Sequence, residues 1–295
     1  MLRLGILACR MSATIAIIGA GRVGRALGRR LKESGWKVGA VISRTPASAH
    51  AAVRAIGAGS AHAKLSREIL EAQVILVTTP DDVVDEVARR LAKMGGEEWR
   101  EKVALHTSGA LDRSALGPLA ELGAATGSLH PMQTFGKNAT PRLEGVVFGI
   151  EGDARARQMA RKIAHALGGT SVVLKGRDKP AYHAAGAMAA GHGLALVETA
   201  TEILMRVGFT RRRATQALVP LVRQMLQNFE RMGPREAWSG PLSRRDYRTI
   251  AKHATALRSY PAEFWEAYAA VARLVARVLS PEPAEMLARL DKILK

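Results

Sequence analysis

The chain is poor in cysteine, in aromatic residues and in long apolar runs. Cys9 is the only cysteine among 295 residues, which excludes a disulfide framework and favours a reducing, cytoplasmic setting. Aromatic residues make up only 4%, so the core must be built mainly from aliphatic side chains and alanine. No apolar run reaches the ~18 residues that a membrane-spanning helix needs, and we expect no membrane association.

Acidic residues are also scarce relative to basic ones. The chain has 44 Lys and Arg against 26 Asp and Glu, a formal net charge of +18. Such an excess can indicate nucleic-acid binding. Here the basic residues are scattered, with short runs only at 211–213 and 244–245, and no base-stacking aromatics lie among them. We therefore predict a preference for small anionic ligands and no nucleic-acid partner. Nucleic-acid binding would instead predict a steep salt dependence of DNA affinity.

The first twelve residues precede the first apolar strand. Ile-Leu-Ala before Cys9 resembles a lipoprotein signal, but its apolar part is too short for a secretory segment. We interpret residues 1–12 as a disordered leader, with Met11 as an alternative start of the chain.

A glycine-rich motif follows this leader directly. Residues 14–24 read TIAIIGAGRVG, an apolar strand that leads into G-x-G-x-x-G and then into a helix over 25–33. The first glycine permits a tight turn, the second lets a pyrophosphate approach the backbone, and the third lets helix and strand pack closely. Free N–H groups at the helix start would bind the phosphates. The motif predicts a dinucleotide site formed by Gly19, Gly21, Arg22, Val23 and Gly24.

The second predicted strand, residues 37–42, decides between NAD and NADP. An NAD-binding fold places an acidic residue near its end to bind the ribose 2′-hydroxyl. No acidic residue occurs between Glu33 and Glu68, and the strand ends in Ser43, Arg44 and Thr45. An arginine with two hydroxyl side chains suits a 2′-phosphate. We therefore predict NADP(H) as the cofactor and expect no metal.

Strands and helices alternate up to residue 174, which predicts a doubly wound, mostly parallel α/β sheet in residues 13–177. Beyond it we find only helical patterns, so a helical domain should span residues 178–295. The carboxyl ends of strands line the ligand crevice in such sheets, which adds Thr78, Thr79, Pro80 and Asp81 to the cofactor site. The predicted strands are 14–18, 37–42, 74–78, 103–106, 124–129, 145–152 and 170–174. The predicted helices are 25–33, 46–56, 83–94, 112–122, 154–167, 181–207, 211–232, 244–257, 261–279 and 283–294.

Hydride transfer requires a proton donor and a clamp for a charged substrate group. His130 follows a strand that ends at the crevice, and His183 lies one turn into the first helix of the predicted helical domain, so both are candidate donors. Each has an alternative: His130 could cap a strand end, and His183 could be an interface histidine. Arg244 and Arg245 could hold a carboxylate, and Asp246 could orient a histidine unless it is used with Ser243 in a capping box.

Three separated motifs resemble one family: SLHPMQTF at 128–135, YHAAG at 182–186 and GPLSRRD at 240–246. The sheet half is similar to the Rossmann-like domain of pyrroline-5-carboxylate reductases, prephenate dehydrogenases and 6-phosphogluconate-dehydrogenase-type enzymes. The whole resembles the group whose C-terminal helical domain was long of unknown function, some members of which are ketopantoate reductases. The resemblance implies an NADP-binding Rossmann domain and a 6-phosphogluconate-dehydrogenase-like helical domain that forms homodimers. It places six residues around nicotinamide and substrate: Ser108, His130, Gln133, Thr134, His183 and Asp246.

The sequence departs from this group where Gly191 and His192 replace an expected asparagine. It departs again from the better-known ketopantoate reductases, which use a lysine on this helix, because the nearest lysine here is Lys179, just before Pro180. The first hypothesis is an NADPH-dependent reductase of a carboxylate-bearing 2-keto acid, with ketopantoate, a pantothenate precursor, as first candidate. The alternatives are an imine reductase of the pyrroline-5-carboxylate type and a non-catalytic NADPH-binding sensor or scaffold.

Overall fold

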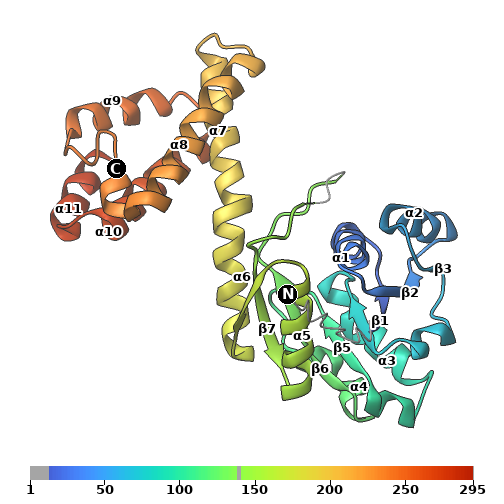
Figure 1. The fold of residues 1–295 in the computed structure, drawn as a ribbon. Helices are drawn as coiled ribbons and strands as arrows, with labels where there is room; N and C mark the ends of the chain where they lie inside the picture. The colour runs from blue at the N-terminus through green and yellow to red at the C-terminus, as the bar shows by residue number, and fades with distance from the viewer. Residues whose placement is uncertain (1–12, 138–140, 295) are drawn as a thin grey trace, which may run out of the picture. The chain divides into compact units, whose positions relative to one another are not determined.

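The structure, a computed structural model, describes residues 13–137 and 141–294 (Figure 1). The predicted leader, residues 1–12, lies outside the described residues. Contacts divide the chain into two compact units, the first ending at Ala190 and the second beginning at Gly191. Helix α6 (Lys179–Ala187), which we expected to open the helical domain after residue 177, therefore belongs to the sheet unit.

The first unit is built on one eight-stranded sheet in the order β3-β2-β1-β4-β5-β6-β7-β8. Neighbouring strands are parallel except for β6 and β7, which confirms the predicted doubly wound sheet. The strands are β1 (Thr14–Ile18), β2 (Lys37–Ile42), β3 (Ser60–His62), β4 (Val74–Val77), β5 (Val103–His106), β6 (Ala125–Pro131), β7 (Val147–Gly152) and β8 (Thr170–Val173).

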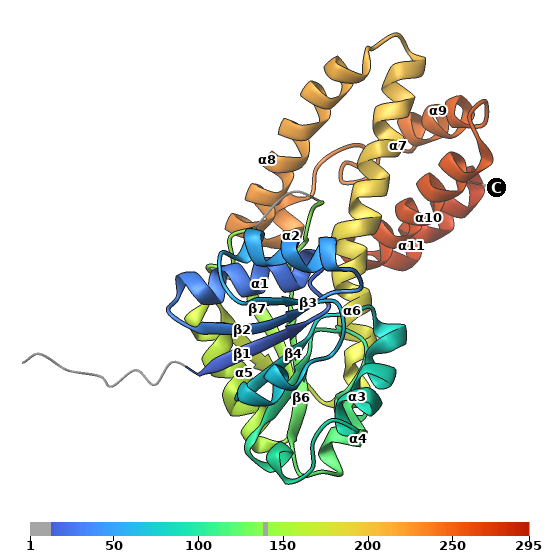
Figure 2. The same cartoon turned by 90° about the vertical axis from the view of Figure 1, so that its right-hand side faces the viewer.

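Helices cover both faces of this sheet, each over its own apolar core (Figure 2). One face carries α1 (Arg22–Glu33), α2 (Pro46–Ile56) and α5 (Ala154–Ala166). The other carries α3 (Val84–Ala92) and α4 (Gly117–Ala120). Because helices cover both faces, the central strands are apolar on both sides, as the fully buried β4 shows.

Local signals explain most of these helix boundaries. Helix α2 begins with a capping box, in which the Thr45 hydroxyl accepts from the Ser48 amide and the Ser48 hydroxyl accepts from the Thr45 amide, each at 3.2 Å. Pro46 occupies its first turn, and Gly57 ends it in the left-handed conformation, with φ 80°. The predicted bounds of this helix, 46–56, are confirmed.

The structure corrects the prediction in two places of the first unit. The helix expected over 112–122 is a 3₁₀ turn, Arg113–Leu116, followed by the single turn of α4. Strand β3 was not predicted, because three residues without an apolar run give no periodic signal.

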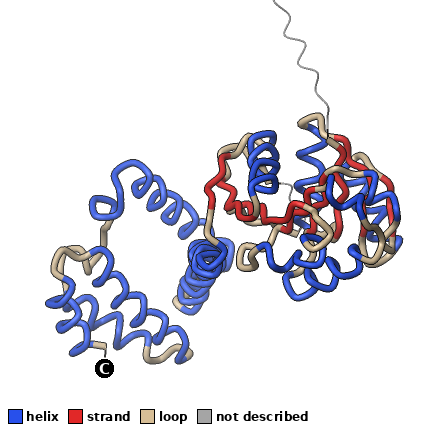
Figure 3. The backbone as a smooth tube through the Cα atoms, turned by 90° about the horizontal axis from the view of Figure 1, so that it is seen from below, coloured by secondary structure: helices blue, strands red, loops and turns tan. Residues whose placement is uncertain are grey.

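The described residues of the second unit form helices and loops without a strand, as predicted (Figure 3). Its core is alanine-rich and lies between α9, α10 and α11. Helices α7 and α8 carry several large apolar side chains that are more than 40% exposed, among them Leu194, Leu221 and Leu226. The helices are α7 (Gly193–Arg206), α8 (Arg211–Ala237), α9 (Tyr247–Leu257), α10 (Ala262–Leu279) and α11 (Pro283–Ile293).

The helix expected over 181–207 is divided into α6, a π-helical turn over Met188–His192, and α7. Among the described residues, no helix is long and apolar enough to cross a membrane.

Candidate functional site

The glycine motif forms a tight turn between β1 and α1 that three strands hold in place. Gly19 has a φ of 92°, and a Cβ atom there would lie 2.7 Å from the Thr79 amide nitrogen, so this position requires glycine. Its own N–H donates to the Ile42 carbonyl at the end of β2, at 2.9 Å. Its carbonyl accepts from the Thr78 hydroxyl at the end of β4, at 2.7 Å. The turn is therefore preformed, and its residues Gly19, Ala20 and Gly21 line the cavity described next.

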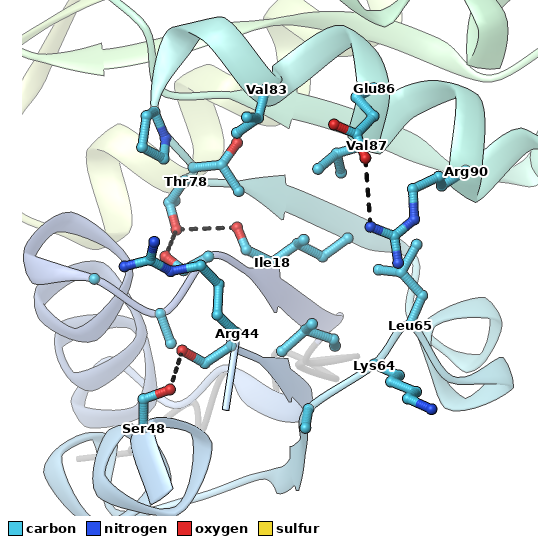
Figure 4. Close-up of a pocket in the computed structure, with 18 of the residues that line it drawn as sticks. Ile18, Arg44, Ser48, Lys64, Leu65, Thr78, Val83, Glu86, Val87 and Arg90 are labelled. Atoms are coloured by element: carbon cyan, nitrogen blue, oxygen red, sulfur yellow. Dashed lines mark hydrogen bonds and ion pairs between the residues drawn. The ribbon is translucent and has the colours of Figure 1, made fainter. Parts of the chain in front are cut away.

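A cavity of about 610 Å³ lies over this turn (Figure 4). It is formed at the carboxyl ends of β1, β2 and β4, the edge where ligands bind in a doubly wound sheet. Its volume lies within the ordinary range of small-molecule sites. The lining residues are Ile18, Gly19, Ala20, Gly21, Arg25, Ile42, Ser43, Arg44, Ser48, Ala63, Lys64, Leu65, Thr78, Thr79, Pro80, Asp82, Val83, Glu86, Val87 and Arg90.

The part of the cavity beyond β2 is basic and rich in hydroxyl groups. The Ser43 and Ser48 hydroxyls are hydrogen-bonded at 2.8 Å, and the Arg44 side chain extends beside them (Figure 4). Lys64 follows the short strand β3 and adds a second cation. Among the described lining residues from β2, α2 and this loop there is no carboxylate; the lining acids come from the segment 82–86. This composition suits a phosphate group.

The end of β4 contributes both to the cavity and to a neighbouring cluster. The Thr79 hydroxyl oxygen is buried and has no hydrogen-bond partner within residues 13–137 and 141–294. A buried polar atom of this kind is suited to a ligand partner. Asp81, predicted to bind cofactor, instead accepts from the Ser108 hydroxyl at 2.6 Å and does not line the cavity.

The other residues predicted for the cofactor have structural contacts of their own. Arg22 donates to the Phe135 carbonyl at 3.3 Å, and Val23 packs against the apolar core. A Cβ atom on Gly24 would lie 2.5 Å from the Thr78 hydroxyl, so this glycine lets α1 pack close to β4. Thr45 caps α2 and is not among the cavity-lining residues.

A second cluster of polar side chains lies where β5 and β6 end and α6 begins; we call it the β5–β6 cluster. Lys179, at 0% exposure, donates to the Ser108 carbonyl at 3.0 Å and to the Ser128 hydroxyl at 2.8 Å. His106, also at 0% exposure, donates from Nε2 to the Asp112 carbonyl and accepts at Nδ1 from the Ser108 amide. The cluster consists of His106, Ser108, Ser128, His130, Lys179, Tyr182 and His183.

The two histidines proposed as proton donors lie together in this cluster. Their rings meet edge to face, with centroids 5.6 Å apart. Nδ1 of His130 is 3.0 Å from the Tyr182 hydroxyl, which also lies 3.3 Å from the His130 carbonyl. A Cβ atom on Gly109 would lie 2.5 Å from the His183 ring and 2.9 Å from Nε2 of His130. The glycine after Ser108 therefore allows both imidazoles to approach the loop.

Burial makes the internal histidines neutral at physiological pH. Desolvation lowers the pKa of His106 to about 4. Desolvation, followed by the nearby positive charges of Lys179 and His183, lowers the pKa of His130 to about 4. Burial also lowers the pKa of Lys179 to about 8, although the carboxylates of Glu151, Asp112 and Asp81 oppose this shift. The ammonium therefore remains mostly protonated at pH 7.

Gln133 and Thr134, predicted to bind substrate, lie in the exposed loop after β6. The Gln133 side-chain oxygen accepts from the Thr134 amide at 2.8 Å, and its side-chain nitrogen donates to the Arg142 carbonyl at 3.4 Å. Their contact with substrate remains a prediction. Lys179, Tyr182 and Lys64 were absent from the predicted site. Lys179 and Tyr182 lie in a helix whose local sequence does not indicate which side chains are buried.

The segment 240–246 belongs to the second unit, where Asp246 is a helix cap. Its Oδ1 accepts from the Thr249 amide at 3.1 Å, and its Oδ2 accepts from the Thr249 hydroxyl at 2.7 Å. Helix α9 begins after Asp246, so the capping box expected with Ser243 is wrong; Ser243 donates to the Gly240 carbonyl instead. Arg244 and Arg245 are both exposed, and Arg245 pairs with Glu282 at 2.6 Å. Catalytic or clamping roles for these residues remain predictions.

No group of three His, Cys, Asp or Glu side chains within 13–137 and 141–294 is placed to hold a metal ion.

Two family models match the chain in succession. Residues 5–131 match the Rossmann-like domain, and residues 146–275 match a domain of unknown function, DUF2520. Together the two matches span both units of the structure.

Several solved structures share this fold. A proposed NADP oxidoreductase from Bacteroides fragilis is 22% identical, with a TM-score of 0.71 over 86% of this chain and 94% of that one. A pyrroline-5-carboxylate reductase from Coxiella burnetii is 13% identical, with a TM-score of 0.60 over 96% and 99%. A pyrroline carboxylate reductase from Plasmodium falciparum, solved with NADP bound, is 11% identical, with a TM-score of 0.56 over 83% and 93%. At these identities the likeness concerns the fold.

Proposed function

Because the chain carries a Rossmann-like domain followed by a DUF2520 domain, we propose that it is an NADP(H)-dependent oxidoreductase. The observation that carries this proposal is the cavity over the Gly19 turn, whose β2 end presents Arg44, Ser43 and Lys64 without a carboxylate among the described lining residues. An NAD-binding site would require an acid there. The NADP held by the P. falciparum enzyme of similar fold is consistent with this choice.

The residues present fit a dinucleotide. The preformed turn of Gly19 and Gly21 would hold the pyrophosphate, and Arg44 with Ser43 would hold the 2′-phosphate. The buried Thr79 hydroxyl, without a partner among the described residues, would gain one. When bound, NADPH would supply the hydride for a reduction.

The proton for such a reduction must come from this chain or from water. His130 has a pKa of about 4 and therefore carries no imidazolium proton near neutral pH. His183 is solvent-exposed and lies against the His130 ring. This arrangement favours His183 as the proton donor and assigns His130 a neutral role, in which it holds a hydrogen bond with Tyr182.

A carboxylate-bearing 2-keto acid is the proposed substrate class, with ketopantoate as first candidate and a step of pantothenate synthesis as the setting. Support comes from the basic character of the chain and from two arginines, Arg244 and Arg245, next to each other in the 240–246 motif. Arg245 is already paired with Glu282, so Arg244 is the better carboxylate ligand of the two.

NADPH oxidation followed by absorbance would test this proposal with a panel of 2-keto acids and pyrroline-5-carboxylate. Faster NADPH oxidation in the presence of ketopantoate would support the proposed substrate. Acceleration by pyrroline-5-carboxylate alone would replace it with an imine reductase. Tight NADPH binding without turnover on any member would favour a sensor or scaffold. Failure to bind NADPH would refute the cofactor assignment itself.

We also propose that the protein is a homodimer through its helical unit. Helices α7 and α8 expose an unusual amount of apolar surface for a monomer, including Leu194 at 69%, Leu221 at 66% and Leu226 at 55%. A second copy of the same surface would bury these side chains. Sedimentation equilibrium gives the direct test.

A further inference from the structure

Lys179 is a buried charge that the proposed function does not use. Lysine is almost never fully buried without a partner, because desolvation of an ammonium is costly. Here the side chain is 0% exposed and donates to one neutral carbonyl and one neutral hydroxyl, those of Ser108 and Ser128. Among the residues that the structure describes, no carboxylate lies within 4.0 Å of its ammonium. The free-energy cost of burying the Lys179 ammonium is therefore not offset by a direct ion pair.

The charged groups that act on Lys179 come from several separate segments. Three carboxylates raise its pKa from a distance: Glu151 of β7, Asp112 before the 3₁₀ turn and Asp81 after β4. All three are engaged elsewhere. Asp81 accepts from the Ser108 hydroxyl, Glu151 from the Arg113 amide at 2.8 Å, and Asp112 from the Ser114 amide at 2.9 Å. The charge of Lys179 also acts on the imidazoles of His106 and His130, and the rings of Tyr182 and His183 contact His130 edge to face.

The geometry connects Lys179 to the candidate catalytic histidines through the backbone. Its acceptor on the β5 side is the carbonyl of Ser108, and the next residue, Gly109, is the one against which both His130 and His183 pack. Its acceptor on the β6 side is Ser128, two residues before His130. The Lys179 ammonium thus links the ends of β5 and β6 to the first turn of α6, the helix that also carries His183.

We propose that Lys179 is a positioning residue, whose buried ammonium fastens the ends of β5 and β6 to the start of α6 and imposes a positive field on His130. The positional part stands on the contacts alone. Its importance for catalysis rests on the proposed function.

The directions in which the pKa values of His130 and His106 are shifted agree with this assignment. After burial, the charge of Lys179 is the largest influence that lowers the pKa of His130, and it also lowers that of His106. Removing the charge should therefore raise the pKa of His130. A purely structural lysine elsewhere in the unit should have no such effect.

Lys102 supplies the matched control. It is also buried, at 7% exposure, and its ammonium donates to two backbone carbonyls, those of Leu70 and Ala72. Burial lowers its pKa too. Its charge is not among the main causes of the pKa shift of His130. Lys102→Met should therefore reproduce a loss of stability without the electrostatic effect.

The test is histidine titration by NMR in the full chain without cofactor or substrate. In Lys179→Met we expect the pKa of His130 to rise by about 0.5–1 unit. Lys179→Arg and Ser128→Ala, which keep a cation at this position, should leave it within ~0.3 unit, as should Lys102→Met. A folded Lys179→Met with an unchanged His130 titration would overturn the proposal, and so would an equal shift in Lys102→Met.

The wild-type chain provides a second measurement if Lys179→Met does not fold. Since Lys179 itself titrates at about pH 8, the His130 ring resonances should show a small inflection near that pH, after their own titration is complete. A flat His130 signal between pH 7 and 9 would refute the electrostatic link. Both readouts are independent of turnover, so an inactive enzyme would refute the proposed function and leave this assignment standing.

Discussion

Arg44 should determine whether the protein prefers NADPH to NADH. The side chain is exposed at the end of β2, beside the hydrogen-bonded pair Ser43 and Ser48, and lines the cavity. The two cofactors differ only in the 2′-phosphate, so Arg44→Ala should weaken NADPH and leave NADH nearly unchanged. Arg44→Asp adds a carboxylate where the described lining residues from β2, α2 and the loop after β3 have none, and should reverse the preference.

The expected loss of NADPH affinity follows from the exposure of the Arg44 side chain. Hydrogen bonds to charged groups contribute about 1.5–3 kcal/mol, and the lower end applies to an exposed arginine. Since 1.4 kcal/mol corresponds to tenfold in affinity, Arg44→Ala should weaken NADPH about 10–30-fold. A carboxylate ~4 Å from the phosphate adds ~1 kcal/mol of repulsion in water, so Arg44→Asp should weaken it about fivefold more. NADH should change by less than about twofold.

Isothermal titration of both cofactors at two salt concentrations measures these differences. Arg54→Ala is the control, because Arg54 belongs to the last turn of α2 and is not among the lining residues. Its NADPH affinity should stay within about twofold of wild type. The loss in Arg44→Ala should shrink at high salt, since exposed charges are screened. Equal losses for NADPH and NADH would refute the role of this side chain in cofactor choice.

Four further predictions concern the cavity, the loop, the buried histidines and the helical unit. Lys64→Ala should weaken NADPH about 2–5-fold by the same titration and leave NADH unchanged, because an exposed cation contributes only ~0.5–1 kcal/mol. Gly109→Ala should lower the free energy of unfolding by about 1–3 kcal/mol, since its Cβ atom would meet both His183 and His130; Gly117→Ala, with nothing within 4 Å, should be tolerated. The pKa of His106 is lowered to about 4 in the folded chain, so the unfolded chain binds its proton first and stability falls from about pH 6.5 towards pH 4. Urea unfolding should show a loss of about 2 kcal/mol from His106 at pH 5, which His106→Gln should lack; an identical pH slope would contradict the assignment. Leu226→Glu should shift the sedimentation equilibrium towards monomer by at least about tenfold, whereas Val278→Glu, at a similarly exposed position on α10, should not.

Much of the fold could be predicted because its signals are local. The apolar runs of β1, β4 and β5 and the capping signals around α2 are contained in a few consecutive residues, and their bounds agree with prediction to within one residue. Strand β3 has no such signal, since it exists only through its pairing with β2. Lys64, which follows β3 and lines the cavity, was therefore also absent from the predicted cofactor site.

The predicted polar sites were less complete because their members are far apart in the sequence. The strand-end rule indicated His130 and the family resemblance indicated Ser108. Neither indicated that Lys179 lies between the segments that carry them, 51 residues beyond Ser128 and 71 beyond Ser108. Asp246 shows a different reason why sequence alone is insufficient, because here the local signal is present but ambiguous. Its local sequence fits both a cap and a catalytic partner, and the structure shows the cap.

The glycine turn has one more consequence, for the thermodynamics of ligand association. Because Ile42 and Thr78 hold the Gly19 peptide from two neighbouring strands, no loop has to be ordered when a dinucleotide arrives, and no entropy of ordering is lost there. The Gly19 amide should exchange with deuterium only when the central sheet opens, with or without ligand. Exposed Arg44 and Lys64, in contrast, lose rotamer freedom on contact. The rigid part of the site should therefore govern affinity common to all dinucleotides, while the entropic cost falls on the side chains that discriminate between them.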